Sequence, residues 1–262
     1  MPGLTIFEAG PESLFGVGRV IQSGAEVTGT MPTGRPYTGP DGRPSIGALG
    51  VLIDNVLGYV IIDSLVGGLW SISTEIWLDM TAPLPSDGSR VTASASSVLT
   101  DHRSGFSIGR IVDANGGLLG VCRQRGRAIA ESPETFEVPA YDAPAPTIAN
   151  VGDLLGLVAV EPDSMTMSIT PALANPRGML HGGVSLCASE VVAVASRSTV
   201  NASLATTSIH IVHARGVPIG SCVDFRATTR HAGRTLWVTE VVGYVGEKAA
   251  TLAYVSAEAL QL

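Results

Sequence analysis

Two short stretches of sequence decide the fold: Ser45-Ile46-Gly47-Ala48-Leu49 and His181-Gly182-Gly183-Val184-Ser185. Each follows a loop rich in Pro and Gly and leads into a mostly apolar segment. When Ser45 is aligned with His181, Asp54 falls on Glu190, so a carboxylate stands nine residues into both segments. A helix that is apolar on nearly every side must be enclosed by other structure. We therefore expect two enclosed helices, one in each copy of an internal repeat.

The segments around both helices repeat in the same order. A short strand-like run precedes each helix, at 25–31 and at 164–170. Four alternating runs follow each helix and predict strands at 72–80, 90–98, 106–112 and 118–129, then at 208–213, 223–229, 235–244 and 248–257. Asn115-Gly116, which lies between two such runs, is a strong signal for a hairpin turn.

The repeat predicts an α+β protein of two modules. We place the N-terminal module at 1–131, a Pro-rich linker without periodicity at 132–150, and the C-terminal module at 151–262. In each module a curved antiparallel sheet would wrap around the apolar helix. Two such sheets can join edge to edge, which hides two exposed strand edges.

Composition narrows the range of functions. The 262 residues carry a formal net charge of −7, which argues against a nucleic-acid partner because neutralising phosphates requires a basic surface. The cysteines, Cys122, Cys187 and Cys222, lack the spacing of a zinc site or a disulfide framework, so we expect them to be buried thiols in a reducing compartment.

Membrane insertion and export are not expected either. The most hydrophobic stretch, 51–66, contains Asp54, Asn55 and Asp63 and is too short and too polar to span a bilayer. The first residues lack the basic start and the apolar run of a signal peptide. The sequence therefore predicts a cytoplasmic protein without a membrane partner.

The loop Asn175-Pro176-Arg177-Gly178-Met179-Leu180-His181-Gly182-Gly183 carries the clearest chemical signal. Gly182 and Gly183 stand where a helix begins, so their N–H groups lack partners within the helix and lie at its positive end. Such donors can hold an oxyanion, and a nearby carboxylate can activate water or attack directly. A purely structural role is the alternative: the two glycines would form a tight turn, and Asp54 or Glu190 would be a buried acid without a catalytic function.

This loop, with a helix carboxylate nine residues after the His, resembles that of the hot-dog-fold acyl-CoA thioesterases. The nearest likeness is to the phenylacetate-pathway and 4-hydroxybenzoyl-CoA branch. The resemblance implies a double hot-dog that hydrolyses an acyl-CoA thioester to free acid and CoA, without a metal or another cofactor. In this family the glycine loop of one module faces the helix carboxylate of its partner. Carried over, the catalytic set would be Asp54, Asn175, His181, Gly182, Gly183 and, as a neighbouring hydroxyl, Ser73.

The resemblance also implies a second, weaker site around Glu190. Gly47 would be its backbone donor and Thr206 or Thr207 its hydroxyl. Ser45 and Gly39 stand where the first loop has His181 and Asn175, so the counterpart loop lacks both side chains. Val194 replaces the threonine that 4-hydroxybenzoyl-type enzymes carry one helical turn after the acid.

Several alternatives stay open from the sequence. The alternative to an enzyme is a catalytically silent acyl-CoA-binding or regulatory protein. A hydratase of the same fold is disfavoured because Leu173 stands where such enzymes carry an Asp before Asn-Pro. The acyl chain, the role of the carboxylate as nucleophile or base, and a homo-oligomer of double modules are not fixed. Predicted hairpin turns carry arginines that either contact CoA phosphates or face solvent: Arg103, Arg230 and Arg234.

Overall fold

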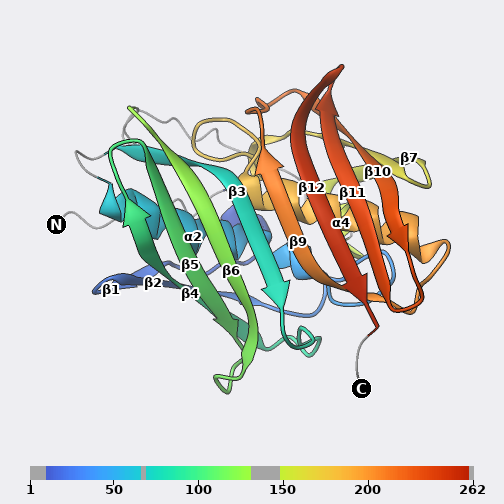
Figure 1. The fold of residues 1–262 in the computed structure, drawn as a ribbon, viewed down its shortest axis with the longest axis horizontal. Coiled ribbons are helices and arrows are strands. Elements are labelled where there is room, and N and C mark those ends of the chain that lie inside the picture. Colours follow the sequence, from blue (N-terminus) through green and yellow to red (C-terminus); the bar gives the residue numbers. More distant parts are fainter. Residues whose placement is uncertain (1–9, 66–68, 131–147, 260–262) are drawn as a thin grey trace.

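The strands form one antiparallel sheet in a computed structural model, which describes residues 10–65, 69–130 and 148–259 (Figure 1). Within this part of the chain the sheet has 12 strands in the order β1-β2-β4-β5-β6-β3-β9-β12-β11-β10-β8-β7. The first half supplies β1 (Ile21–Ser23), β2 (Glu26–Pro32), β3 (Trp70–Met80), β4 (Arg90–Thr100), β5 (Ser104–Val112) and β6 (Leu118–Ile129). The second half supplies β7 (Leu157–Glu161), β8 (Ser164–Ser168), β9 (Ala205–His213), β10 (Cys222–Ala232), β11 (Leu236–Val245) and β12 (Lys248–Glu258).

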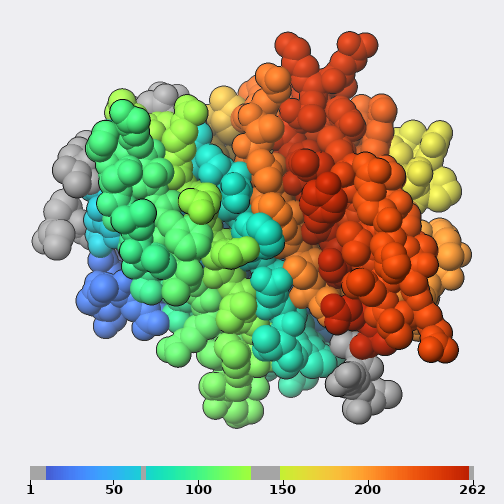
Figure 2. All heavy atoms as spheres, in the orientation of Figure 1, coloured from blue at the N-terminus to red at the C-terminus, as the bar shows by residue number. Residues whose placement is uncertain are grey.

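The two halves join through β3 and β9, which pair in antiparallel register with Trp77 opposite His210. The Trp77 and His210 rings stack at 3.6 Å between centroids, and the Arg123 guanidinium lies 4.0 Å above the Trp77 ring. Ser208 Oγ donates a hydrogen bond of 2.6 Å to Asp79 Oδ1 across the same joint. Figure 2 shows the cyan atoms of β3 against the orange atoms of β9, so the exposed face of the sheet is continuous. The expected edge-to-edge joining is confirmed.

Two long helices, α2 (Gly50–Ser64) and α4 (Gly182–Ser198), lie on one face of this sheet, behind the strands in Figure 1. The segment Ile46–Ser64 is apolar and long enough to span a membrane by composition, but 83% of its most apolar window is buried inside the protein. It is a core helix. The sheet of each half curves around its own helix, as the sequence predicts.

The two helices approach each other most closely where they begin. A side chain at Gly183 would overlap the Gly50 carbonyl group and lie 2.5 Å from Val51 N. A side chain at Gly50 would overlap the Gly183 carbonyl in turn. The backbones of the two halves therefore touch at these glycines, which places the start of each helix beside the helix of the other half.

The structure corrects the sequence analysis in several details. The first helix begins with a 3₁₀ turn, η1 (Ile46–Leu49), and turns α-helical only at Gly50. Four short elements were expected as loops or left unassigned: α1 (Pro11–Leu14), α3 (Val151–Leu155), β1 and β7. Both strands are largely exposed, so neither shows the alternation that marks a half-buried strand. A 3₁₀ turn, η3 (Pro171–Leu173), precedes the glycine loop.

Cys222 is exposed, whereas Cys122 and Cys187 are buried as expected. Residues 132–147 of the proposed linker lie outside the described residues.

Candidate active site

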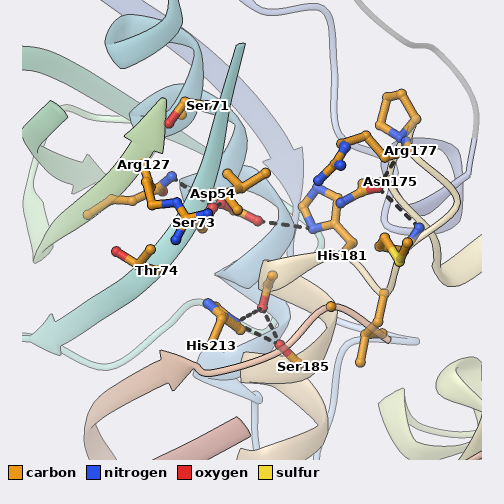
Figure 3. A pocket seen from close by; sticks show the side chains of 18 of the residues that line it. Asp54, Ser71, Ser73, Thr74, Arg127, Asn175, Arg177, His181, Ser185 and His213 are labelled. Atoms are coloured by element: carbon orange, nitrogen blue, oxygen red, sulfur yellow. Dashed lines mark hydrogen bonds and ion pairs between the residues drawn. The ribbon is translucent and has the colours of Figure 1, made fainter. Parts of the chain in front are cut away.

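A cavity of about 550 Å³ opens between the two halves at the start of α4. Figure 3 shows Asp54 and Ser73, from α2 and β3, facing the loop that carries Asn175 and His181. Gly182 also lines the cavity. The predicted composite arrangement, in which the second half's loop faces the first half's carboxylate, is therefore present.

Asp54 is a buried carboxylate of this cavity, with 8% of its surface exposed. Its Oδ1 accepts a hydrogen bond of 2.5 Å from Ser73 Oγ. Its Oδ2 accepts one of 2.9 Å from the Gly183 N–H and lies 3.3 Å from His181 Nδ1. Asp54 is thus held in one orientation by donors from both halves of the chain.

The two glycines of the loop have different partners. The Gly183 N–H is donated to Asp54 and, at 3.1 Å, to His181 Nδ1, so it is not free for a substrate as the sequence analysis expected. The Gly182 N–H, in the first position of α4, has no acceptor among the described residues. A side chain at Gly182 would lie 2.7 Å from Asp54 Oδ2, so the bare backbone fits directly against the carboxylate. Of the two glycines, Gly182 is the one whose backbone N–H is left for an oxyanion within the described part of the chain.

His181 is buried and belongs to a chain of polar groups that ends at the N-terminal segment. Its Nδ1 accepts from Gly183, which leaves Nε2 to donate to Asn55 Oδ1 at 3.3 Å. Asn55 Nδ2 in turn donates to Glu12 Oε1 at 3.3 Å. Burial raises the pKa of Glu12, and the nearby His181 opposes this. These contacts fix the ring of His181 beside Asp54, and the sequence analysis did not single out Asn55 or Glu12 as partners.

Asn175 shapes the loop. Its Oδ1 accepts hydrogen bonds from Arg177 N at 3.0 Å and from Met179 N at 3.2 Å. The turn also needs a left-handed residue, which Gly178 supplies with φ of 68°. Asn175 lines the cavity, but its carbonyl oxygen is already committed to the turn. This geometry supports a positioning role for Asn175.

Gln124 is a site residue that the sequence analysis missed. It lies on β6, is 1% exposed, and its Nε2 donates to Ser73 Oγ at 2.9 Å. Its Oε1 is buried without a partner among the described residues. The signal in the sequence was a polar residue at an inward position, since Cys122 and Gly126 alternate with it along the strand. Asp54, Ser73 and Gln124 form one hydrogen-bonded row.

His213, the last residue of β9, also lines the cavity. Its Nε2 lies 2.9 Å from Ser185 Oγ and 3.3 Å from the Gly182 carbonyl oxygen. Removal of the ring from water lowers the pKa of His213, and the Asp54 carboxylate opposes this. We conclude that His213 packs against the start of α4 as a neutral ring.

The arginines of the cavity are not those that the sequence singled out. Its lining includes Arg127, Arg177 and Arg215. Arg103, Arg230 and Arg234 line neither this cavity nor the second one described below. Arg230 instead pairs with Glu240 at 2.5 Å, from an exposed position.

A second cavity, of about 490 Å³, surrounds Glu190, which is 2% exposed. Glu190 Oε2 accepts hydrogen bonds from Ser45 Oγ and, at 2.7 Å, from the Gly47 N–H. Burial raises the pKa of Glu190, and these two bonds oppose the shift. Thr206 lines the cavity; its Oγ1 has no partner in hydrogen-bond geometry, yet it is close enough to lower the pKa of Glu190. The predicted counterpart residues therefore do meet here.

The strand register identifies what this second cavity lacks. Thr74 is the unpaired bulge residue of β3 against β6, and Thr207 is the unpaired bulge residue of β9 against β12. Two residues after each bulge, Ile76 pairs with Gln124 and Ile209 pairs with Val255. Val255 therefore occupies the position of Gln124, and the second cavity has no equivalent amide.

Among the described residues, no group of three or more His, Cys, Asp and Glu side chains could hold a metal ion.

Comparison with known proteins identifies the fold. No family model matches the sequence, and no curated protein matches it significantly. The TesB protein of Mycobacterium avium subspecies paratuberculosis is similar over 97% of this chain and 100% of its own, with a TM-score of 0.66 and 8% identity. The 12:0-ACP thioesterase from Umbellularia californica matches over 90% of this chain and 94% of its own chain, with a TM-score of 0.61 and 11% identity.

A protein of unknown function with the hot-dog fold, from Alicyclobacillus acidocaldarius, matches over 93% of this chain and 96% of its own chain. Its TM-score is 0.60 at 13% identity. At such identities the likeness concerns the fold alone, and that fold is the double hot-dog.

Proposed function

We propose that this chain hydrolyses an acyl-CoA thioester to the free acid and CoA at the cavity around Asp54. The observation that carries the proposal is the position of Asp54 between donors from both halves and directly against Gly182, the first residue of α4. A carboxylate beside a backbone donor at a helix start is the pair that attack on a carbonyl requires. The loop with Asn175 and His181 favours the phenylacetate-pathway and 4-hydroxybenzoyl-CoA branch.

In the proposed reaction Asp54 acts as a general base on water. The carboxylate takes one proton from the water as its oxygen bonds to the thioester carbon, and the carbonyl electrons move onto the oxygen. The Gly182 N–H stabilises that oxyanion, an effect worth roughly 3–4 kcal/mol for one well-placed donor. The oxyanion then collapses, the C–S bond breaks, and the CoA sulfur takes the proton back from Asp54. Ser73 and Gln124 keep the carboxylate in orientation throughout.

The two ends of the cavity suit the two ends of such a substrate. Tyr59, Ile62 and Trp70 line the part along α2 and β3 and offer an apolar surface to an acyl group. Arg177 and Arg215, on the side of the glycine loop, supply the positive charge that CoA phosphates need. We assign the acyl group to the first part and the nucleotide to the second.

The test is release of free thiol from a panel of acyl-CoAs by the wild type and by Asp54→Asn. Removing the base should lower kcat by roughly 10²–10⁴-fold. Asp63→Asn is the matched control, because Asp63 lies on the same helix, is exposed, and accepts its hydrogen bond from Gln22 at 2.6 Å. Both variants must keep the denaturation midpoint of the wild type within the error of the measurement.

The same panel separates hydrolysis from silent binding. Binding of acyl-CoA without turnover in the wild type would favour the regulatory alternative. Equal turnover by the wild type and Asp54→Asn would remove Asp54 from the mechanism.

A further inference from the structure

The second cavity has the size and the walls of a small-molecule site. Its volume of about 490 Å³ falls in the range of ligand pockets, roughly 300–1,000 Å³. Its apolar lining comes from both halves: Ile46, Met80, Ala82, Leu84 and Val194. One group of polar side chains in this lining is formed where Glu190 lies beside the start of β9.

Two threonine hydroxyl groups lie at that place. Thr207 Oγ1 is buried and has no hydrogen-bond partner among the described residues, and Thr206 Oγ1 is buried and has only Glu190 nearby, outside good hydrogen-bond geometry. A buried donor left unsatisfied costs about 1–3 kcal/mol. Thr207 lines the cavity, so rotation of its side chain toward the cavity would let its hydroxyl donate to an acceptor on a ligand. Thr207 is the clearer case, because Thr206 also lies close to Glu190.

The second cavity is not equipped for hydrolysis. Ser45 takes the place of His181, and its Oγ, like the Gly47 N–H, is donated to Glu190 Oε2. Val255 takes the place of Gln124. A carbonyl bound here would therefore meet hydroxyl groups without the hydrogen-bonded row that orients Asp54 in the first cavity.

Charge favours a neutral ligand head. The cavity is lined by three acids, Asp41, Glu190 and Glu258, and by one cation, Arg43. Arg43 Nη1 already donates to the Leu204 carbonyl at 2.9 Å. A carboxylate would face a surplus of like charge, whereas the carbonyl of an ester, amide or thioester would not.

We propose that the second cavity binds the acyl group of a neutral acyl compound and does not hydrolyse it. The chain lies against the apolar walls, and its carbonyl accepts a hydrogen bond from Thr207. The choice of an acyl ligand rests on the proposed function, because the two cavities are related by the repeat. The existence of the site rests on the cavity itself.

The test uses a photoreactive probe, an N-ethyl amide of a medium-chain fatty acid that bears a diazirine. After irradiation, mass spectrometry locates the label. We expect labelling in 80–84 or at the start of β9. This readout does not require thioester turnover, so it is distinguishable from failure of the proposed function. Labelling confined to the first cavity, or to neither cavity, would overturn the inference.

Two variants sharpen this test. Ala205→Phe fills the cavity from a half-buried position and should reduce the label there at least about tenfold. Thr207→Val keeps the shape and removes the hydroxyl, so it should weaken probe binding about fivefold, as expected for one hydrogen bond of about 1 kcal/mol. It should also leave the denaturation midpoint of the unliganded protein unchanged or raised, because no partner is lost.

Thr74→Val is the matched control, at the equivalent bulge of the first half. It should not change the affinity of the second cavity. If Thr207→Val instead lowers the denaturation midpoint and leaves probe affinity intact, Thr207 is structural and the site is not a ligand site.

Discussion

The contact between the two helix starts leads to a demanding prediction for Gly183→Ala. A methyl group at this position would overlap the Gly50 carbonyl and lie 2.5 Å from Val51 N, where ordinary contact begins at 3.4 Å. The atoms in the way are backbone, so no side chain can turn aside. The helices would have to separate by about 1 Å, in a core that is packed to the density of a crystal.

The expected cost follows from this geometry. Overpacking of a core typically costs about 1–3 kcal/mol, and a backbone collision belongs at the upper end. Replacing Gly by Ala in a helix stabilises the folded state by at most about 1 kcal/mol through helix propensity. The net loss is then about 2 kcal/mol, which corresponds to a fall of roughly 4–8 °C in Tm for a chain of this size. Hydrolysis should fall as well, since the Gly183 N–H would move away from Asp54.

Calorimetry of Gly183→Ala and of a matched variant, Gly58→Ala, is the assay. Gly58 lies within α2, where a methyl group would meet only the Gln124 amide nitrogen, at 3.4 Å. This control should be as stable as the wild type or slightly more stable. If Gly183→Ala matches Gly58→Ala in Tm, the two helices do not touch as described.

Three further outcomes follow from the site. Gly182→Ala would place a methyl group 2.7 Å from Asp54 Oδ2, so turnover should fall by at least about tenfold with little change in Tm; unchanged turnover would contradict the described contact. Gln124→Leu removes a donor to Ser73 and should lower kcat more than it raises KM, which steady-state kinetics with an acyl-CoA would show. Folding raises the pKa of Glu190, so its ionised form destabilises the folded state, and Glu190→Gln should gain Tm over the wild type as the pH rises above about 4.5. A difference in Tm that does not change with pH would refute this. The turnover of Glu190→Gln should fall less than about tenfold.

The fold was predictable from the sequence because each element of the repeat has a recognisable local pattern of apolar and turn residues. Alternation and turn residues mark the eight meander strands, and the apolar run around Asp54 marks an enclosed helix. Elements without a buried face, such as β1, carry no such pattern. The 3₁₀ turn before α2 also left no signal, because the same apolar composition suits either helix.

The candidate site was predictable only in part. The pairing of Asp54 with the loop at Gly182 came from the resemblance to a family, since sequence spacing does not say which half faces which. Gln124 and Glu12 could not be predicted as site residues, because their contacts join positions far apart in the chain, Gln124 to Ser73 and Glu12 to Asn55. The role of the Gly183 N–H depended on a side-chain orientation that no sequence pattern encodes.

The division of each cavity between the two halves accounts for their inequality. The first cavity takes its carboxylate row from the first half and its glycine loop from the second. The first half's own loop and the second half's helix carboxylate line the second cavity instead. A change there, such as Ser45 in place of a His or Val255 in place of a Gln, leaves the first cavity complete. In a dimer of identical single modules the same change would alter both sites at once. A duplicated chain can thus combine one cavity built for chemistry with another that only binds. The buried Thr207 hydroxyl, which has no partner among the described residues, is what we expect in such a binding cavity.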